Sequence, residues 1–134
     1  MAEPVKPVAK CVYVCDDVIG DPSSGKVTIL NLWDAVRIPP SEVLPYRLGK
    51  LCVFVWWRDG FGKVTSRIDI VQASTGTIVR RTRDCLIGFE RRTDSVFARY
   101  MIDDCTFPEL GYYYVEMYCE GEFVDDQLIR VIQE

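Results

Sequence analysis

Residues 111–131 read GYYYVEMYCEGEFVDDQLIRV. The side chains of the eight residues after Gly111 fall on two sides: Tyr113, Val115, Met117 and Cys119 on one, and Tyr112, Tyr114, Glu116 and Tyr118 on the other. Successive side chains of a β-strand point to opposite faces, so this alternation predicts a strand with one apolar face. Glu120-Gly121 predicts a turn, followed by a return strand that carries Phe123, Leu128 and Val131. Since an isolated hairpin is only marginally stable in water, we expect this one to pack against other strands.

The length and composition indicate one domain with a hydrophobic core. The chain has 134 residues, of which 49% are apolar, and this size is typical of a single domain. We expect residues 1–8, which contain Pro4 and Pro7, to be a flexible lead-in and residues 9–134 to form the domain. No apolar run approaches the roughly 18 residues that cross a bilayer, and the first residues lack the apolar segment of a secretory signal. The sequence therefore predicts a cytoplasmic protein.

The rest of the chain also predicts strands. They are expected at residues 10–16, 26–38, 48–57, 64–72, 77–81, 85–89 and 95–105. Residues 51–57, LCVFVWW, are apolar without alternation, which predicts a central strand covered on both faces. Trp56 and Trp57 point to opposite sides of that strand, so both are buried only if both sides are covered. Residues 64–72 alternate, which predicts a half-exposed strand.

These patterns together predict the fold class. No helical period recurs over a window of about 11 residues. Turn signals such as Asp21-Pro22-Ser23-Ser24-Gly25 separate the strands. The first two strands are expected to form an N-terminal hairpin around that turn. Short alternating strands with regularly spaced turns are typical of an all-β fold, here an antiparallel β-sandwich of about eight strands.

Two segments carry a resemblance to known folds. Residues 107–114, FPELGYYY, resemble the tyrosine corner of immunoglobulin-like sandwiches, which implies that Tyr112, Tyr113 or Tyr114 bonds back to the backbone. Residues 14–39, VCDDVIGDPSSGKVTILNLWDAVRIP, resemble the opening of a family of small, uncharacterised bacterial proteins with an immunoglobulin-like body. This resemblance implies a bacterial cytoplasmic protein and transfers no known activity or site.

Cysteine and histidine usage argues against common catalytic sites. The six cysteines include no Cys-x-x-Cys pair, and the chain has no histidine. Close cysteine pairs are typical of zinc and iron–sulfur sites, and histidine is the commonest general base. We therefore expect reduced cysteines that serve as small apolar residues. The sequence therefore predicts that the protein is not an enzyme, binds no cofactor and has no catalytic or metal-binding residue.

Charged residues leave two less favoured alternatives open. The acidic pairs Asp16-Asp17, Asp103-Asp104 and Asp125-Asp126 are expected to be solvated strand ends, although strand ends gathered at one rim could hold Ca²⁺ and support a metal-dependent enzyme. Arginines concentrate in residues 80–99, and a nucleic-acid-binding module would contact phosphates there. The candidate phosphate contacts are Arg80, Arg81, Arg91 and Arg92. The acidic pI of about 4.9 weighs against this alternative, and ion pairing between strands is the simpler interpretation.

The favoured hypothesis is a non-catalytic protein-binding or assembly module. Its partner surface would be a sheet face that carries Tyr112, Tyr114 and Tyr118, or an edge strand. The partner is expected to be another protein or a second copy of the chain. Residues 58–99 carry nine basic and five acidic side chains, whereas residues 100–134 carry one basic and nine acidic. Such a division favours self-association or a charged partner if the two segments lie on different sides.

Overall fold

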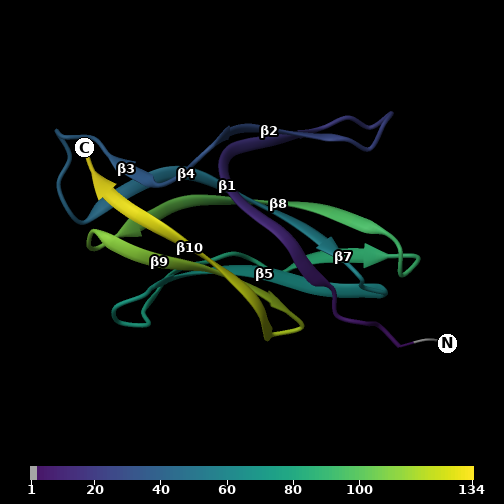
Figure 1. Ribbon diagram of the computed structural model, residues 1–134. Coiled ribbons are helices and arrows are strands. Elements are labelled where there is room, and N and C mark those ends of the chain that lie inside the picture. The colour runs from purple at the N-terminus through teal and green to yellow at the C-terminus, as the bar shows by residue number, and fades with distance from the viewer. Residues whose placement is uncertain (1–2) are drawn as a thin grey trace.

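Strands account for all the regular structure that the computed structural model describes, which covers residues 3–134 (Figure 1). The elements are β1 (Val8–Gly20), β2 (Val27–Leu32), β3 (Val36–Ile38), β4 (Tyr46–Arg58), β5 (Gly62–Gln72), β6 (Ile78–Arg81), β7 (Cys85–Phe89), β8 (Ser95–Phe107), β9 (Gly111–Cys119) and β10 (Glu122–Gln133). None of the described residues forms a helix long and apolar enough to cross a membrane.

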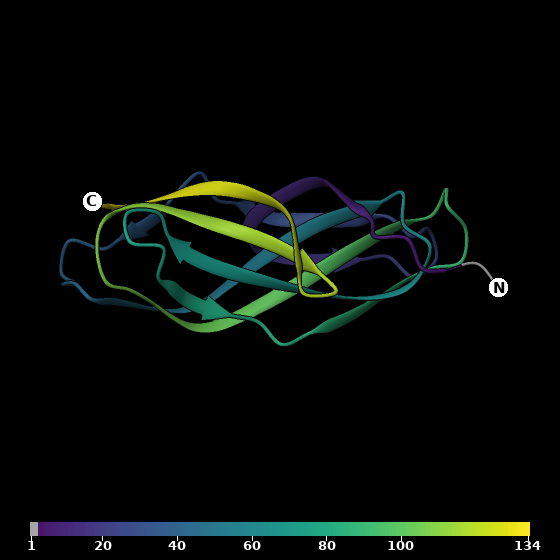
Figure 2. The same cartoon turned by 90° about the horizontal axis from the view of Figure 1, so that it is seen from below.

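The strands form two stacked sheets. The first sheet has the order β2-β1-β4-β8, and the second has the order β3-β10-β9-β5-β6, with β7 pairing to β5 beside β6. Figure 2 shows the strands of the second sheet crossing those of the first at an angle. This arrangement confirms the predicted all-β sandwich, with ten strands where the sequence predicts about eight. All pairings are antiparallel except β3 with β10, which is parallel.

The prediction of a single strand at residues 26–38 is wrong. The chain instead forms β2 in the first sheet and then crosses to the second sheet as β3. Asn31 has a positive φ of 50° at the end of β2, a conformation that interrupts a strand. The Asp16 carboxylate accepts hydrogen bonds from Asn31 Nδ2 and Trp33 Nε1, both at 2.6 Å. These bonds hold the segment between β2 and β3 against β1.

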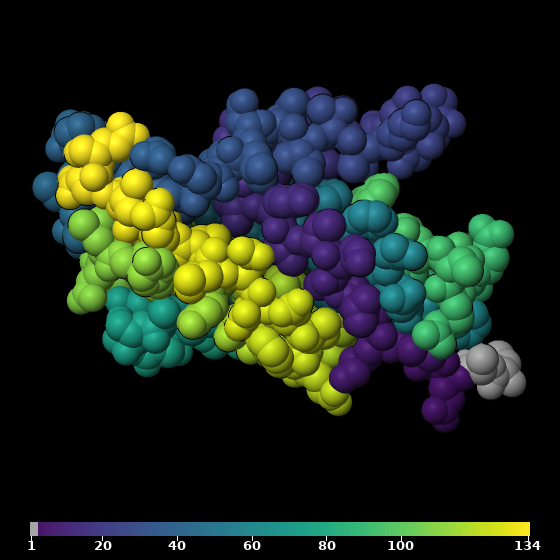
Figure 3. All heavy atoms as spheres, viewed as in Figure 1, coloured from purple at the N-terminus to yellow at the C-terminus, as the bar shows by residue number. Residues whose placement is uncertain are grey.

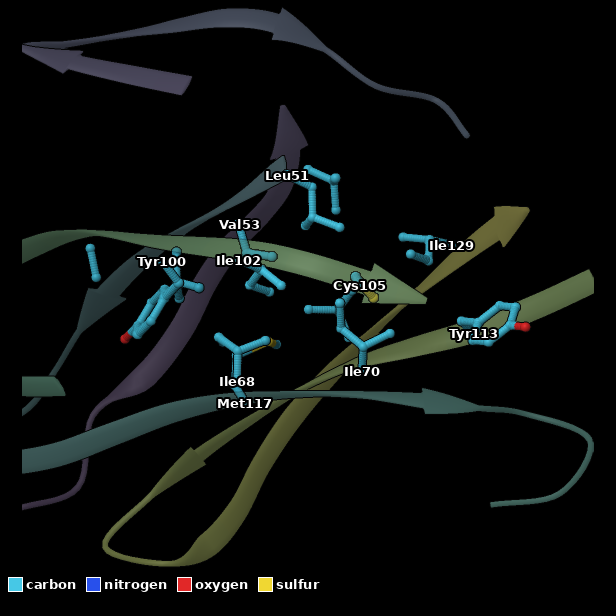
Figure 4. Close-up of a cluster of buried hydrophobic side chains, with 14 of the residues drawn as sticks. Leu51, Val53, Ile68, Ile70, Tyr100, Ile102, Cys105, Tyr113, Met117 and Ile129 are labelled. Carbon is cyan, nitrogen blue, oxygen red and sulfur yellow. The ribbon is translucent and has the colours of Figure 1, made fainter. Parts of the chain in front are cut away.

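β4 is the central strand of the first sheet, as predicted. Leu51, Val53, Val55 and Trp57 face the second sheet and are fully buried. Figure 4 shows Val53 and Ile102 of the first sheet facing Ile68 and Met117 of the second. A row of apolar side chains meeting across two sheets forms the core of a sandwich. The six cysteines are all reduced, and four of them are buried.

A polar network crosses this core. Trp57 Nε1 donates to the Tyr100 hydroxyl at 3.0 Å, and that hydroxyl lies 2.6 Å from Ser66 Oγ. Ser66 Oγ donates in turn to the carbonyl of Cys85 at 3.0 Å. Burial raises the pKa of Tyr100 to about 12. The network joins β4 and β8 of the first sheet to β5 and β7 of the second, and it satisfies each buried polar side chain in it.

β5 is more buried than its alternation predicts. Asp69 lies on the outer side of the strand, where the sequence predicts an exposed residue, yet it is fully buried. Arg81 of β6 donates to both of its carboxylate oxygens at 2.9 Å, and Arg67 donates to both at 3.2 and 3.5 Å. The two guanidinium groups cover the carboxylate, one from the neighbouring strand β6 and one from the same face of β5. The prediction that β5 is half-exposed is therefore wrong at Asp69.

The last hairpin forms as the sequence predicts. β9 and β10 are joined at Glu120-Gly121, and the predicted apolar face of β9 is fully buried or nearly so. Of the three tyrosines that could make the corner, Tyr113 does so: its hydroxyl donates to the Glu109 carbonyl at 2.7 Å and accepts from the Glu109 N–H at 3.2 Å. This geometry has the form of a tyrosine corner.

The beginning of the chain lies against the β4–β5 turn. Met1 and Ala2, part of the predicted flexible lead-in, lie outside the described residues. Val5 forms an isolated β-bridge with Phe61, with N–O distances of 2.9 and 3.1 Å. Lys6 forms an ion pair with Glu122 at the start of β10. These contacts connect the segment before β1 to the second sheet.

Candidate interaction surface

The outer face of the first sheet carries an apolar stripe along β4. Outward-pointing residues alternate with the core residues, because strand side chains point to opposite faces. The outward residues are Lys50, Cys52, Phe54, Trp56 and Arg58. Phe54 is 4% exposed and Trp56 is half-buried. The stripe therefore has three apolar side chains in its centre and a cation at each end.

Neighbouring strands extend the stripe into a group of aromatic rings. Phe54 stacks on Tyr13 of β1 with 6.4 Å between ring centroids, and it lies 5.8 Å from Phe97 of β8. Phe97 also makes an edge contact with Trp56 at 5.6 Å. Tyr13 and Phe97 are each 40% exposed. We call these four residues the aromatic surface.

Trp56 has an unsatisfied polar atom within this surface. Its Nε1 is buried and has no hydrogen-bond partner among residues 3–134. The guanidinium of Arg58 lies 5.6 Å from the centre of the indole ring, in cation–π range. An unpaired buried N–H costs free energy, but this one is closed to solvent, so an acceptor on another molecule reaches it only if the neighbouring side chains move.

The β1–β2 hairpin covers one end of the outer face. Figure 1 shows β1 turning near its middle, so that the hairpin lies above β4 and β8. Cys15 and Cys52 are opposite each other across β1 and β4, and both are fully buried beneath the hairpin. Burial raises the pKa of the Cys52 thiol to about 12. A thiol with so high a pKa is a poor nucleophile at neutral pH.

A hollow lies between the hairpin turn and the aromatic surface. It has a volume of about 350 Å³, and its lining includes Pro22, Lys26, Val27 and Phe97. Figure 3 shows the turn projecting beyond the body of the molecule, with an open notch below it. Phe97 therefore lines the hollow and is also part of the aromatic surface.

The tyrosines predicted as a partner surface lie on the outer face of the second sheet. Tyr112 is 54% exposed, whereas Tyr114 and Tyr118 are half-buried. Tyr118 is held by its neighbours: its hydroxyl donates to Glu116 at 2.8 Å, and the guanidinium of Arg67 lies 4.2 Å above its ring. The three tyrosines follow one strand without forming a cluster of rings in contact.

The arginines predicted to contact phosphate are not gathered in one place. Arg80 lines a hollow of about 690 Å³ beside the edge of β8, and its Nε donates to the Asp103 carbonyl at 3.1 Å. Arg81 binds Asp69 on the outer face of the second sheet. Arg91 pairs with Asp94 in the β7–β8 turn, at 3.2 Å, and its neighbour Arg92 is exposed in the same turn.

The hollow beside β8 has mixed charge. Its lining includes Arg80, Arg83 and Arg99, but also Asp84 and Asp103. Carboxylates between the guanidinium groups weaken the attraction for a chain of phosphates. The structure therefore separates the arginines of the basic segment and pairs Arg81, Arg91 and Arg99 with carboxylates.

Three carboxylates of the acidic pairs, those of Asp16, Asp17 and Asp104, accept bonds from side chains elsewhere in the chain. Asp17 pairs with Arg99 at 2.5 Å, and Asp104 pairs with Arg47 at 2.7 Å. Hydrogen bonds from Asn31 and Trp33 lower the pKa of Asp16, and the hydrogen bond from Arg99 lowers that of Asp17. Asp125 and Asp126 lie in β10, in the other sheet from the first two acidic pairs. Within residues 3–134, no three acidic or cysteine side chains are arranged to hold a metal ion.

The sequence contains a signal for the aromatic surface that the pattern analysis missed. The apolar run of β4 places Cys52, Phe54 and Trp56 on one side, and the alternation of β1 places Tyr13 on one side with Cys11 and Cys15. What the sequence lacks is the order of the strands. Only the pairing of β4 with β1 and β8 brings Tyr13 and Phe97 to the same face.

The fold and surface define a class of molecule, a β-sandwich in which one sheet face presents partly exposed aromatic rings. The chain belongs to a family of unknown function (DUF6941), which matches residues 10–132. This agrees with the predicted membership of an uncharacterised family, while the bacterial setting stays a prediction. No curated protein matches the chain.

Several solved structures match the chain, and one of them shows how limited the likeness is. It is a Pseudomonas fluorescens alkylpurine DNA glycosylase, AlkC, bound to DNA containing an abasic site analog. The sequence identity is 12% and the TM-score is 0.43. The likeness covers 90% of this chain and 30% of the glycosylase chain, so this chain corresponds to less than a third of that protein.

Proposed function

We propose that this chain is a non-catalytic protein-binding module that acts through the aromatic surface. The observation that carries the proposal is a group of four rings on an outer sheet face, with Tyr13 and Phe97 each 40% exposed. Contiguous exposed apolar area on a soluble protein marks interaction sites. Aromatic residues are also enriched in the centres of protein interfaces, where a few of them supply most of the binding free energy.

The surroundings of the rings indicate the chemistry of the partner. Lys50 and Arg58 lie at the two ends of the β4 stripe, and neither forms an ion pair with any described residue. A fitting partner therefore presents an apolar side chain bordered by carboxylates. Opposite charges at the rim favour correct orientation and faster association.

The absence of catalysis is proposed from composition and chemistry. The chain has no histidine, and the thiols of Cys52 and Cys105 have pKa values raised to about 12 by burial. These thiols remain protonated at neutral pH, so neither has the thiolate form that attacks a substrate. The proposal therefore assigns the aromatic rings to binding alone.

Phe97→Ser is the variant that tests the proposal, with Tyr112→Ser as its matched control. Both remove an exposed ring, but from opposite outer faces of the sandwich. Proteins captured by the wild type from the source cells are compared with those captured by each variant. Any candidate is then purified, and its affinity for each chain is measured by calorimetry.

We expect the Phe97→Ser chain to bind the purified partner about tenfold more weakly or worse, as for an interface anchor, and the Tyr112→Ser chain to bind normally. Equal binding by the wild type and Phe97→Ser would contradict the proposal. Loss of binding in Tyr112→Ser alone would assign the function to the tyrosines of β9.

A further inference from the structure

We propose that the aromatic surface binds the β9–β10 turn of a second copy of this chain, in a head-to-tail contact. This inference rests on the proposed function and names the partner of that surface. The turn fits the required chemistry: Phe123, beside it, is 52% exposed and is flanked by carboxylates.

Phe123 is held in place as an anchor. Its ring makes an edge contact with Tyr118, with 5.9 Å between centroids. Tyr118 is itself fixed by Arg67 and Glu116. A ring that is already ordered loses little conformational entropy on binding, so more of its burial contributes to affinity.

The charges of the two surfaces are complementary. Residues 116–126 contain five acidic side chains and no basic one: Glu116, Glu120, Glu122, Asp125 and Asp126. Of these, only Glu122 forms an ion pair with a described residue. The aromatic surface is bordered by Lys50 and Arg58, and Lys26 lines the adjoining hollow. These three cations have no described ion-pair partner, although Asp21 lines the hollow with Lys26 and Asp103 lies opposite Lys50 on β8.

The hollow beside Phe97 offers a place for the incoming ring. It is an open depression of about 350 Å³. Pro22 and Val27 supply apolar walls, and its charged lining residues are Asp21 and Lys26. With Phe123 there, the carboxylates that flank it would lie near Lys26, which lines the same hollow.

The contact joins two different surfaces, so it is heterologous. The β9–β10 turn and the β1–β2 turn lie far apart in Figure 1, and a copy cannot bind itself. Each pair therefore leaves one turn and one aromatic surface free. Repetition of such a contact makes a ring if the rotation closes and a filament if it does not.

A complementation experiment tests this geometry. Phe123→Ser removes the anchor, Phe97→Ser removes the wall of the receiving surface, and each variant is studied alone and in an equimolar mixture by sedimentation velocity. We expect the mass of the wild type to rise with concentration and each variant to remain monomeric. The mixture is expected to form a one-to-one pair, because each variant keeps the surface that the other lacks. Tyr112→Ser serves as the control and should associate like the wild type.

A second pair of variants guards against misfolding. Asp125→Lys reverses a charge beside the anchor and Lys50→Glu reverses one at the receiving surface; both residues are exposed, so the fold should tolerate the changes. Each change is expected to weaken self-association about tenfold, and added salt should weaken the wild type as well.

Three results would overturn the inference: a wild type that stays monomeric at all concentrations, a Phe123→Ser chain that still associates, or a mixture that stays monomeric. A monomeric wild type would leave the proposed function standing if Phe97→Ser still abolished binding of another purified protein. If the wild type neither associated with itself nor depended on Phe97 to bind another purified protein, both proposals would be refuted.

Discussion

Trp56 and Trp57 are adjacent in β4 and have opposite environments. Trp57 is fully buried between the sheets, and its Nε1 donates to the Tyr100 hydroxyl at 3.0 Å. Trp56 lies on the outer face, half-buried among rings from β1 and β8, and its Nε1 has no described partner. The core side of the strand is thus packed and hydrogen-bonded, whereas the outer side has an unused donor.

The difference separates residues that stabilise the fold from residues available for binding. A satisfied buried group contributes to stability in the isolated chain. An exposed aromatic group contributes most when another molecule covers it. Removing a side chain from the core side of β4 should therefore lower stability, and removing one from the outer side should mainly weaken association.

The largest difference in stability is expected between Trp57→Ala and Trp56→Ala. Trp57→Ala leaves a cavity in the core and should lower the free energy of unfolding by about 3–5 kcal/mol. Trp56→Ala removes only partly buried area and should cost roughly 1–2 kcal/mol. Urea unfolding followed by far-ultraviolet circular dichroism measures both. Equal losses would mean that the two faces are packed to the same degree.

A smaller difference is expected between Tyr100→Phe and Tyr13→Phe, which remove only a hydroxyl. Without the Tyr100 hydroxyl, the indole N–H of Trp57 loses its acceptor, and the variant should be less stable by about 1–3 kcal/mol. The Tyr13 hydroxyl makes no hydrogen bond to any part of the chain that the structure describes, so Tyr13→Phe should change stability little. A destabilised Tyr13→Phe would show a structural role for the outer face.

Side-chain alternation was sufficient to predict the inner face. The period of two in residues 112–119 correctly places Tyr113 and its neighbours in the core, and the apolar run at residues 51–57 correctly predicts the central strand. Both inferences depend on one strand at a time. The break after Asn31 could not be predicted in this way, since alternation continues through residues 26–38 while the chain changes sheets.

The outer face depends on strand order, which alternation does not contain. Tyr13, Phe54 and Phe97 come from three strands, and nothing local to each strand indicates that they meet. Asp69 is a similar case: its partner Arg81 lies on the next strand, and the pairing buries a residue that its position predicts to be exposed. The partner surface predicted on β9 rests on tyrosines that share one face of a single strand, which alternation alone identifies.

Asp69 gives the outer face of the second sheet a stabilising ion cluster, which should appear as a pH dependence. Burial alone would raise the pKa of this carboxyl, but hydrogen bonds from Arg81 and Arg67 outweigh it, and the net pKa is lowered. A lowered pKa in the folded state means that the stabilisation is present above the unfolded value of about 3.9 and is lost as the pH falls through the folded value.

Asp69→Asn should therefore be less stable at pH 7 by roughly 1–2 kcal/mol, a figure reduced by the exposure of Arg81. The difference between the wild type and the variant should shrink as the pH falls below the unfolded value of about 3.9 and disappear once the carboxyl is protonated in the folded state. Urea unfolding at a series of pH values measures this. A difference that stays constant down to pH 2 would mean that the charge of Asp69 contributes nothing.

The smallest effect is expected at the tyrosine corner. Tyr113→Phe removes the hydroxyl that donates to the Glu109 carbonyl and accepts from its N–H, and it keeps the edge contact of the ring with Phe107 at 5.1 Å. The expected loss is about 0.5–1.5 kcal/mol, with Tyr112→Phe, on the exposed side of β9, as an unaffected control. Because the corner fixes the entry into β9 and not the position of Phe123, self-association per folded molecule should be unchanged. A Tyr113→Phe chain that folds fully but no longer associates would show that the hairpin acts as one unit, and that the separation between core and contact surface does not extend to the second sheet.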